Sequence, residues 1–215
     1  DVPGHTVGIV PLLADRGVEL LHIGVNPATP VPEVPEIFRW KCGDASVIVM
    51  YSRDYGEICE FGETALVFGF TGDNHGPQGG EQLVSIYRSL QEKYPEAVIR
   101  AAVLDDAAMA LRGADLPVIE GEIGDSWIHG VGTDPTKTRG FRAILRSGKD
   151  LCGPELCDTL LPVPEHTWGM DLKTHFHNEK DWLPAEIEAC TEKEKIEKSW
   201  QEQRSYVYKA AEQLG

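Results

Sequence analysis

Ser46-Val47-Ile48-Val49-Met50-Tyr51 is the stretch of sequence that decides the expected fold. It is short, rich in β-branched residues and apolar without alternation, which is typical of a strand that is covered on both faces of a sheet. Two similar apolar runs are Val18–Val25 and Thr64–Phe70. We therefore expect these segments to be buried strands of one sheet.

Helical patterns alternate with further short apolar runs. Glu81–Tyr94 carries apolar residues three and four positions apart, as an amphipathic helix does. Thr133 or Asp134 can cap a helix that has Pro135 at its first position and ends near Ser147. The remaining expected elements are helices at Thr6–Asp15, Ala107–Arg112 and Glu186–Leu214 (one helix or two) and strands at Val98–Val103 and Leu116–Glu120. This alternation favours an α/β fold with a parallel sheet.

Charge and hydropathy exclude several partners and locations. The 215 residues include 20 basic and 35 acidic residues, for a formal net charge of -15. This balance argues against a nucleic acid or an anionic membrane surface as partner, because both require clustered Lys and Arg. No apolar run approaches the roughly 18 residues of a membrane span, and we expect no signal peptide. Together with five scattered cysteines that form no Cys-x-x-Cys pair, this predicts a cytoplasmic protein with reduced thiols.

Four loops combine glycine with ionisable residues, and they are where an α/β fold would carry chemistry, at the carboxyl ends of strands. They are Asp1–Thr6, Thr71–Gly80, Glu120–Gly130 and Pro164–Gly169. The chain starts at Asp1 rather than at Met, so we expect a fragment that lacks the strand before the first loop.

The second and third loops suggest acid/base chemistry on a sugar. Asp73 stands among four glycines directly after a strand, which allows close approach of a ligand, although a flexible turn would use the same residues. Trp127 lies beside carboxylates, and its ring can stack on the apolar face of a sugar or simply cover the core. Trp40 is a further candidate platform for stacking.

The fourth loop suggests a metal. His166 is followed by Asp171, His175 and His177, and His with Asp is a ligand set for Zn²⁺ or a similar divalent ion. Surface or hydrogen-bonded histidines are the alternative. Taken alone, the four loops indicate a hydrolytic α/β enzyme with a carbohydrate-like site.

The order of these motifs resembles the catalytic segment of family 38 glycoside hydrolases, the class II α-mannosidases. Asp1-Val2-Pro3-Gly4-His5-Thr6, then a helix and Leu21-His22-Ile23-Gly24, is similar to that family's Asp-x-Phe-Gly-His-Ser-like motif and the strand that follows it. Gly72-Asp73-Asn74-His75-Gly76-Pro77 is similar to a glycine-rich loop of bacterial members, and Gly121-Glu122-Ile123 through His129-Gly130 to a segment ending in His-x-Gly. The resemblance covers roughly residues 1–169 and is closest to an uncharacterised bacterial branch, a domain of unknown function (5054-type).

The resemblance implies a fold and site roles. The fold would be a partial (β/α)7-type barrel with mostly parallel strands, followed by a helical C-terminal segment. Asp1 would be the nucleophile and a zinc ligand, Asp73 the acid/base, and His166 a second zinc ligand. The expected substrate-binding residues are Trp127, His129, Trp168, Glu122 and His5.

The expected domains are a catalytic barrel at 1–165, incomplete at its N-terminus, and a helical region at 166–215 that extends it or begins the next region. The expected function is a retaining, α-mannosidase-like glycosidase that acts on a carbohydrate with a divalent metal. The chain alone is expected to be inactive and to bind zinc weakly, because two further family ligands lie in an upstream His-x-Asp motif. Two alternatives are a metal-dependent polysaccharide deacetylase-like hydrolase and a non-catalytic carbohydrate-binding relative. The ligand pattern upstream of Asp1 would discriminate among them.

Overall fold

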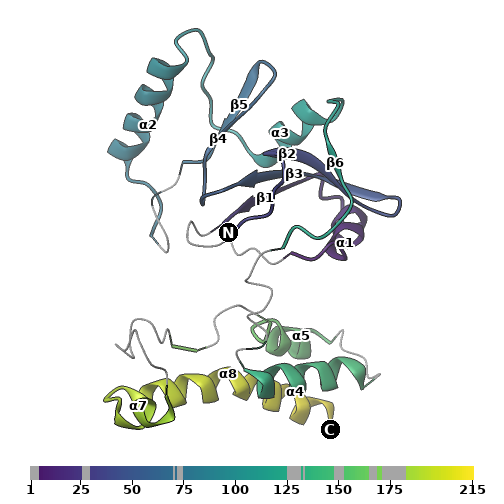
Figure 1. The fold of residues 1–215 in the computed structure, drawn as a ribbon, viewed down its shortest axis with the longest axis vertical. Helices are drawn as coiled ribbons and strands as arrows, with labels where there is room; N and C mark the ends of the chain where they lie inside the picture. The colour runs from purple at the N-terminus through teal and green to yellow at the C-terminus, as the bar shows by residue number, and fades with distance from the viewer. Residues whose placement is uncertain are drawn as a thin grey trace. The chain divides into compact units, whose positions relative to one another are not determined.

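The computed structural model forms two units, residues 1–128 and 129–215 (Figure 1). The residues that it describes are 5–25, 30–69, 71, 75–124, 132, 134–147, 153–164, 169–170 and 183–215. The expected division into a domain at 1–165 and a helical region at 166–215 stays a prediction. Among the helices of these described residues, none has the length and apolar character needed to cross a membrane.

The first unit contains two small sheets. The larger has the strand order β1-β3-β2-β6, and a separate antiparallel pair is formed by β4 and β5. In the larger sheet β1 is parallel to β3, β2 is antiparallel to β3, and β6 is parallel to β2. The strands are β1 (Leu20–Gly24), β2 (Ile37–Cys42), β3 (Ala45–Ser52), β4 (Ile58–Phe61), β5 (Thr64–Val67) and β6 (Val118–Ile119).

The predicted barrel of mostly parallel strands is wrong, because the described strands form an open, mixed sheet and a hairpin. Two short turns cause the difference. Gly43-Asp44 joins β2 to β3 and Gly62-Glu63 joins β4 to β5, and both glycines have positive φ angles of 60° and 58°. Two-residue turns reverse the chain direction and produce antiparallel hairpins in place of helical crossovers. The expected pattern of strands followed apolar runs and omitted β2 and β4.

The strand predicted over Ser46–Tyr51 is confirmed as β3, which is buried on both faces. Val47, Val49 and Tyr51 pack in one core cluster with Val10 of α1 (Ile9–Asp15). Alternate residues of the same strand, Ile48 and Met50, pack in a second cluster with α3 (Leu104–Leu111). Figure 1 accordingly shows α1 below the sheet and α3 above it.

Of two further predicted elements of this unit, one is confirmed and one is wrong. The helix expected over Glu81–Tyr94 is confirmed as α2 (Gly80–Lys93). The strand expected over Val98–Val103 is wrong, because this segment pairs with no described strand. Val98 is 92% exposed and Val103 is 65% exposed, so the run lacks the burial that an apolar strand requires.

Trp40 belongs to the core, so its predicted role as a stacking platform for a sugar is wrong. Its side chain is 0% exposed, and its indole Nε1–H donates a 2.7 Å hydrogen bond to the carbonyl of Gly121. Ile123, two residues further along, is buried in the same core cluster. Trp40 therefore attaches the segment after β6 to the sheet.

We expect Trp40→Phe to lower the free energy of unfolding by about 1–2 kcal/mol, because the partly buried carbonyl of Gly121 loses its hydrogen-bond donor. Urea unfolding followed by circular dichroism measures this change. Trp200→Phe, the same substitution in the second unit, is the matched control, because it leaves the Trp40 hydrogen bond in place. A Trp40→Phe variant as stable as the wild type would contradict the assignment.

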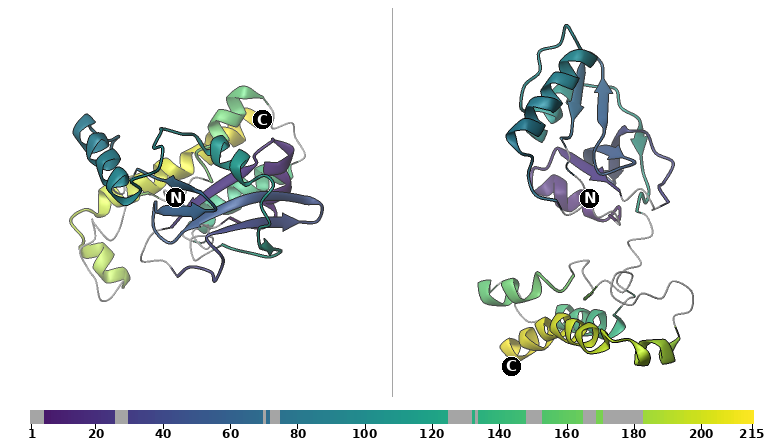
Figure 2. Two further views of the ribbon diagram at one scale, coloured as in Figure 1. Left: turned by 90° about the horizontal axis from the view of Figure 1, so that it is seen from above. Right: turned by 90° about the vertical axis from the view of Figure 1, so that its left-hand side faces the viewer.

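The regular elements among the described residues of the second unit are helices. They are α4 (Pro135–Arg146), α5 (Pro154–Leu160), α7 (Pro184–Ala189) and α8 (Lys193–Leu214). The long C-terminal helical pattern forms two helices, because Cys190 leaves the helical conformation with φ -70° and ψ 127°. α4 and α8 lie along one another (Figure 2). A Cβ at Gly140 would lie only 2.6 Å from Cγ1 of Val207, so this close approach of α4 to α8 requires glycine.

Asp134 joins the start of α4 to α8. Of the two predicted capping candidates, Thr133 and Asp134, it is the N-cap, and its carboxylate accepts hydrogen bonds from the backbone N–H groups of Thr136 and Lys137. Its second oxygen accepts a 2.7 Å bond from Nε of Arg204, and the Asp134 side chain is only 5% exposed. Burial alone would raise the pKa of this carboxyl, but the Arg204 guanidinium and the backbone donors outweigh burial and lower the pKa.

We expect Asp134→Ala to lower the free energy of unfolding by about 2–4 kcal/mol, because both the cap and the partner of Arg204 are lost. Asp134→Asn keeps a capping oxygen and should cost about half as much. Since the folded-state pKa is lowered, the contribution of Asp134 is present above the ordinary aspartate pKa and is lost as the pH falls through the folded-state value. Urea unfolding at two pH values measures both effects, and equal stability of the Ala variant and the wild type would contradict them.

Candidate functional site

The first and third predicted loops meet in the first unit. The backbone N–H of Val7 donates a 2.8 Å hydrogen bond to Oε2 of Glu122, across 115 residues of sequence. His5, two residues before Val7, is partly buried, and Glu122 is exposed. Two of the predicted substrate-binding residues, His5 and Glu122, therefore belong to segments that are in direct contact.

Core residues hold this contact in place. After Val7 the chain enters α1, whose Val10 is 0% exposed. Val10 and Ile123 share one hydrophobic cluster, so burial anchors the segments on either side of the hydrogen bond. The Trp40 bond to the carbonyl of Gly121 fixes the residue immediately before Glu122. The other carboxylate oxygen of Glu122 remains able to accept a hydrogen bond from a hydroxyl group.

The second predicted loop is described at Thr71 and over residues 75–80. The Thr71 hydroxyl donates to the carbonyl of Gly76 at 2.9 Å, and Nδ1 of His75 donates to the carbonyl of Thr71 at 3.1 Å. Gln78 closes the loop by donating from its side-chain amide to the carbonyl of Gly69. The described residues before and after Asp73 are thus bonded to one another, while Asp73 itself lies outside the described residues.

Sequence reasoning missed a histidine–serine pair at the carboxyl ends of β1 and β3. Nε2 of His22 and Oγ of Ser52 share a 3.0 Å hydrogen bond, and Ser52 is 5% exposed. The ring of Phe68, just after β5, stacks on His22 with centroids 3.7 Å apart. The parallel register that places Gly24 opposite Ser52 creates this pair, and no local motif indicates it.

Burial lowers the pKa of His22 to about 4, so its imidazole is neutral near pH 7. A neutral imidazole can accept a proton from a hydroxyl group. Within the described part of the chain, however, no carboxylate forms a hydrogen bond that orients this ring, as a nucleophilic triad would require. The His22–Ser52 pair is therefore best described as a partly buried polar contact that joins β1 to β3.

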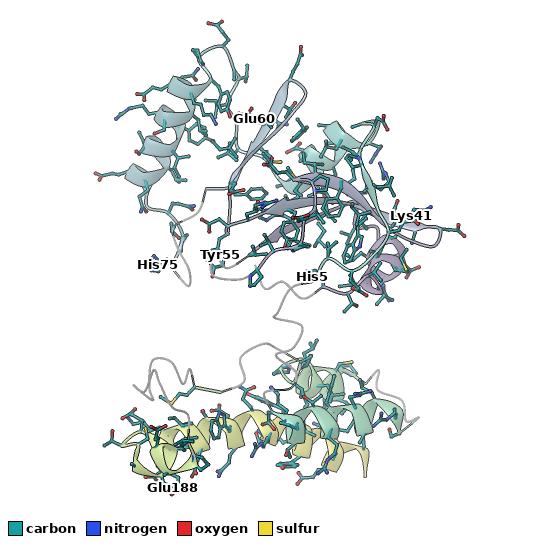
Figure 3. The ribbon with its side chains drawn as sticks, viewed as in Figure 1. His5, Lys41, Tyr55, Glu60, His75 and Glu188 are labelled. Carbon is teal, nitrogen blue, oxygen red and sulfur yellow. The ribbon has the colours of Figure 1, made fainter. Side chains whose placement is uncertain are left out.

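Strand direction limits which loops can share one edge of the sheet. β1 and β3 are parallel, so their carboxyl ends lie at the same edge. β6 runs with β2 and hence opposite to β3, so its carboxyl end lies at the other edge, where Glu120 pairs with Lys41 at 3.0 Å. Figure 3 shows Lys41 at one end of the first unit and Tyr55 and His75 at the other. The third loop therefore starts at the β6 edge and reaches Val7 through Glu122.

Most of the predicted site lies outside the described residues. This applies to both catalytic carboxylates, to the second zinc ligand and to the aromatic and histidine residues of the third and fourth loops. These residues are Asp1, Asp73, His166, Trp127, His129 and Trp168. The predicted separation of Asp1 and Asp73 and the predicted approach of Asp1 to His166 therefore stay predictions.

Among the described residues, no group of three His, Cys, Asp or Glu side chains could hold a metal ion. The first unit has a pocket of about 200 Å³. It opens at the amino ends of β1 and β3, where Arg112 forms an ion pair of 2.7 Å with Glu19. None of the predicted site residues lines it.

Residues 131–215 match a family model that is described as a domain of unknown function (DUF5054). This match covers the second unit almost completely. No curated protein matches the chain, and no solved structure matches it.

We expect the free energy of unfolding to fall as the pH is lowered from about 6.5 to about 4, because the unfolded chain protonates His22 before the folded one does. Between pH 7 and pH 5 the loss due to His22 should be about 1 kcal/mol, after allowing for solvent screening of a partly exposed ring. Urea unfolding at both pH values measures it. His22→Gln should weaken this pH dependence, whereas His75→Gln, the same change at an exposed histidine, should preserve it. An unchanged pH dependence in His22→Gln would contradict the shifted pKa.

Proposed function

We propose that this chain is part of a retaining, α-mannosidase-like glycoside hydrolase that acts on a carbohydrate. The observation that carries the proposal is the hydrogen bond from Val7 to Glu122, which joins the residue directly after the first loop to the third loop, and the motif order assigns both loops to one site. The match of residues 131–215 is consistent with the bacterial branch that the motifs resemble most. The proposal rests on these loops and not on a barrel, since the described strands form none.

Two carboxylates carry the proposed reaction. A retaining glycosidase holds them about 5–5.5 Å apart, one to attack the anomeric carbon and one to protonate the leaving oxygen. We assign the attack to Asp1 and the proton transfer to Asp73. The acid must be protonated when substrate binds, so its pKa has to be raised by its surroundings. His5 and Glu122 would then bind sugar hydroxyls, and Trp127 or Trp168 would stack on the sugar ring.

Zinc belongs to this proposal through the resemblance, which assigns Asp1 and His166 as ligands. The described residues by themselves provide no metal site, so no step of the reaction is assigned to the metal. When bound, a divalent ion would hold sugar hydroxyls and orient the nucleophile. Metal analysis of the complete gene product that contains this chain tests this part separately from the carboxylate roles.

We expect Asp1→Ala to abolish hydrolysis of an activated aryl α-mannoside by the complete gene product, because no covalent intermediate can form. Asp73→Ala should retain the first step with a good leaving group, which needs no protonation, and azide should accelerate its turnover. Steady-state kinetics with and without azide measure both effects.

Asp44→Ala, an exposed carboxylate in the turn between β2 and β3, is the matched control and should keep wild-type activity. Azide rescue of Asp1→Ala in place of Asp73→Ala would reverse the two roles. Wild-type activity in both variants would exclude these carboxylates, and an inactive wild type that still binds the sugar would favour a non-catalytic relative.

A further inference from the structure

The exposed face of α4 carries three arginines around one pocket in the second unit. Arg139, Arg142 and Arg146 line it together with Gly132, Pro135 and Thr138, and its volume is about 420 Å³. We call this pocket the α4 groove. The opposite face of α4 is buried, since Lys137 is 2% exposed and Ile144 is 7% exposed. Packing against the rest of the unit therefore directs the three arginines to the outer side of the helix.

The arginines of the α4 groove are exceptional in so acidic a chain. The chain has a formal net charge of -15, yet α4 contains no Asp or Glu. Elsewhere basic side chains are commonly paired, as Lys193 is with Glu188 and Arg112 with Glu19. Within the described part of the chain, none of the three groove arginines forms an ion pair with an acidic residue.

Helix geometry brings these charges close together. Residues three and four positions apart are neighbours on a helix, so Arg142 lies beside both Arg139 and Arg146. The whole row is about 10 Å long, from a rise of about 1.5 Å per residue. Like charges in these positions destabilise a helix. An anionic ligand between the arginines would offset their mutual repulsion, because it attracts each of them.

We propose that the α4 groove binds a compact ligand that carries two or three phosphate or sulfate groups. Guanidinium groups form paired hydrogen bonds with such oxyanions. The three arginines provide several of these N–H donors along about 10 Å. The volume lies within the range of small-molecule sites. A long polyanion is disfavoured because the negative charge of the rest of the chain would repel it. The ligand can be a free oligophosphate or a sugar with several phosphate or sulfate groups, and this proposal does not depend on the proposed glycosidase activity.

Isothermal titration calorimetry of the whole chain with tripolyphosphate and, in a separate arm, with a multiply sulfated disaccharide tests the proposal. We expect saturable one-to-one binding of at least one of these ligands and at least tenfold weaker binding of inorganic phosphate. The tighter of the two arms identifies the source of the oxyanion groups. Arg142→Gln should weaken binding at least tenfold, because Arg142 is the central member of the row.

Two further variants distinguish binding that depends on the geometry of the groove from binding that depends only on positive charge. Arg142→Lys keeps the charge but loses the planar fork, so it should bind with intermediate affinity. Arg88→Gln removes an exposed arginine of α2 in the other unit and should leave the affinity within twofold of the wild type. Circular dichroism checks that each variant is folded.

Absence of saturable binding in both arms would overturn the proposal, as would equal weakening by Arg142→Gln and Arg88→Gln. A single-stranded oligonucleotide that bound much more tightly than both compact ligands would also overturn it, because the groove would then serve an extended polyanion.

Discussion

Burial of β3 on both of its faces is the constraint on which the rest of the first unit depends. Because Val47 and Val49 point to one side and Ile48 and Met50 to the other, each face of the sheet needs its own cover. α1 covers the first face and α3, with the β4–β5 hairpin, the second. The backbone of β3 pairs with β1 on one side and β2 on the other, so the strand lies between two partners that provide hydrogen bonds to its backbone.

In the second unit, α4 has one buried face and one exposed face. One side of α4 is buried against its neighbours, and the Asp134–Arg204 pair ties its first turn to α8. An ion pair with so little exposure requires good geometry to offset desolvation, and the two backbone donors to Asp134 provide additional bonds. The exposed side of α4 carries three arginines, so the positive charge of the α4 groove is accessible to a ligand.

The candidate glycosidase site and the α4 groove rest on different kinds of observation. The first depends on a motif order, supported by one long-range contact between Val7 and Glu122. The second depends on the charge, spacing and exposure of side chains within a single helix. Since the observations come from different units, the glycosidase assignment and the oxyanion assignment can be tested independently.

The sequence by itself determined the local elements: the buried strand at Ser46–Tyr51, the amphipathic α2, and the start of α4 after a capping residue at Thr133 or Asp134. Each depends on residues that are close along the chain, where periodicity and capping chemistry act. Only the tertiary structure decided the strand directions, the burial of Trp40, and the contacts of His22 with Ser52 and of Val7 with Glu122. These depend on which distant segments meet, and an apolar run has the same appearance in parallel and antiparallel pairs. The physical reason is that burial of apolar surface is favourable in either strand direction, whereas two-residue turns and specific hydrogen bonds select the partner.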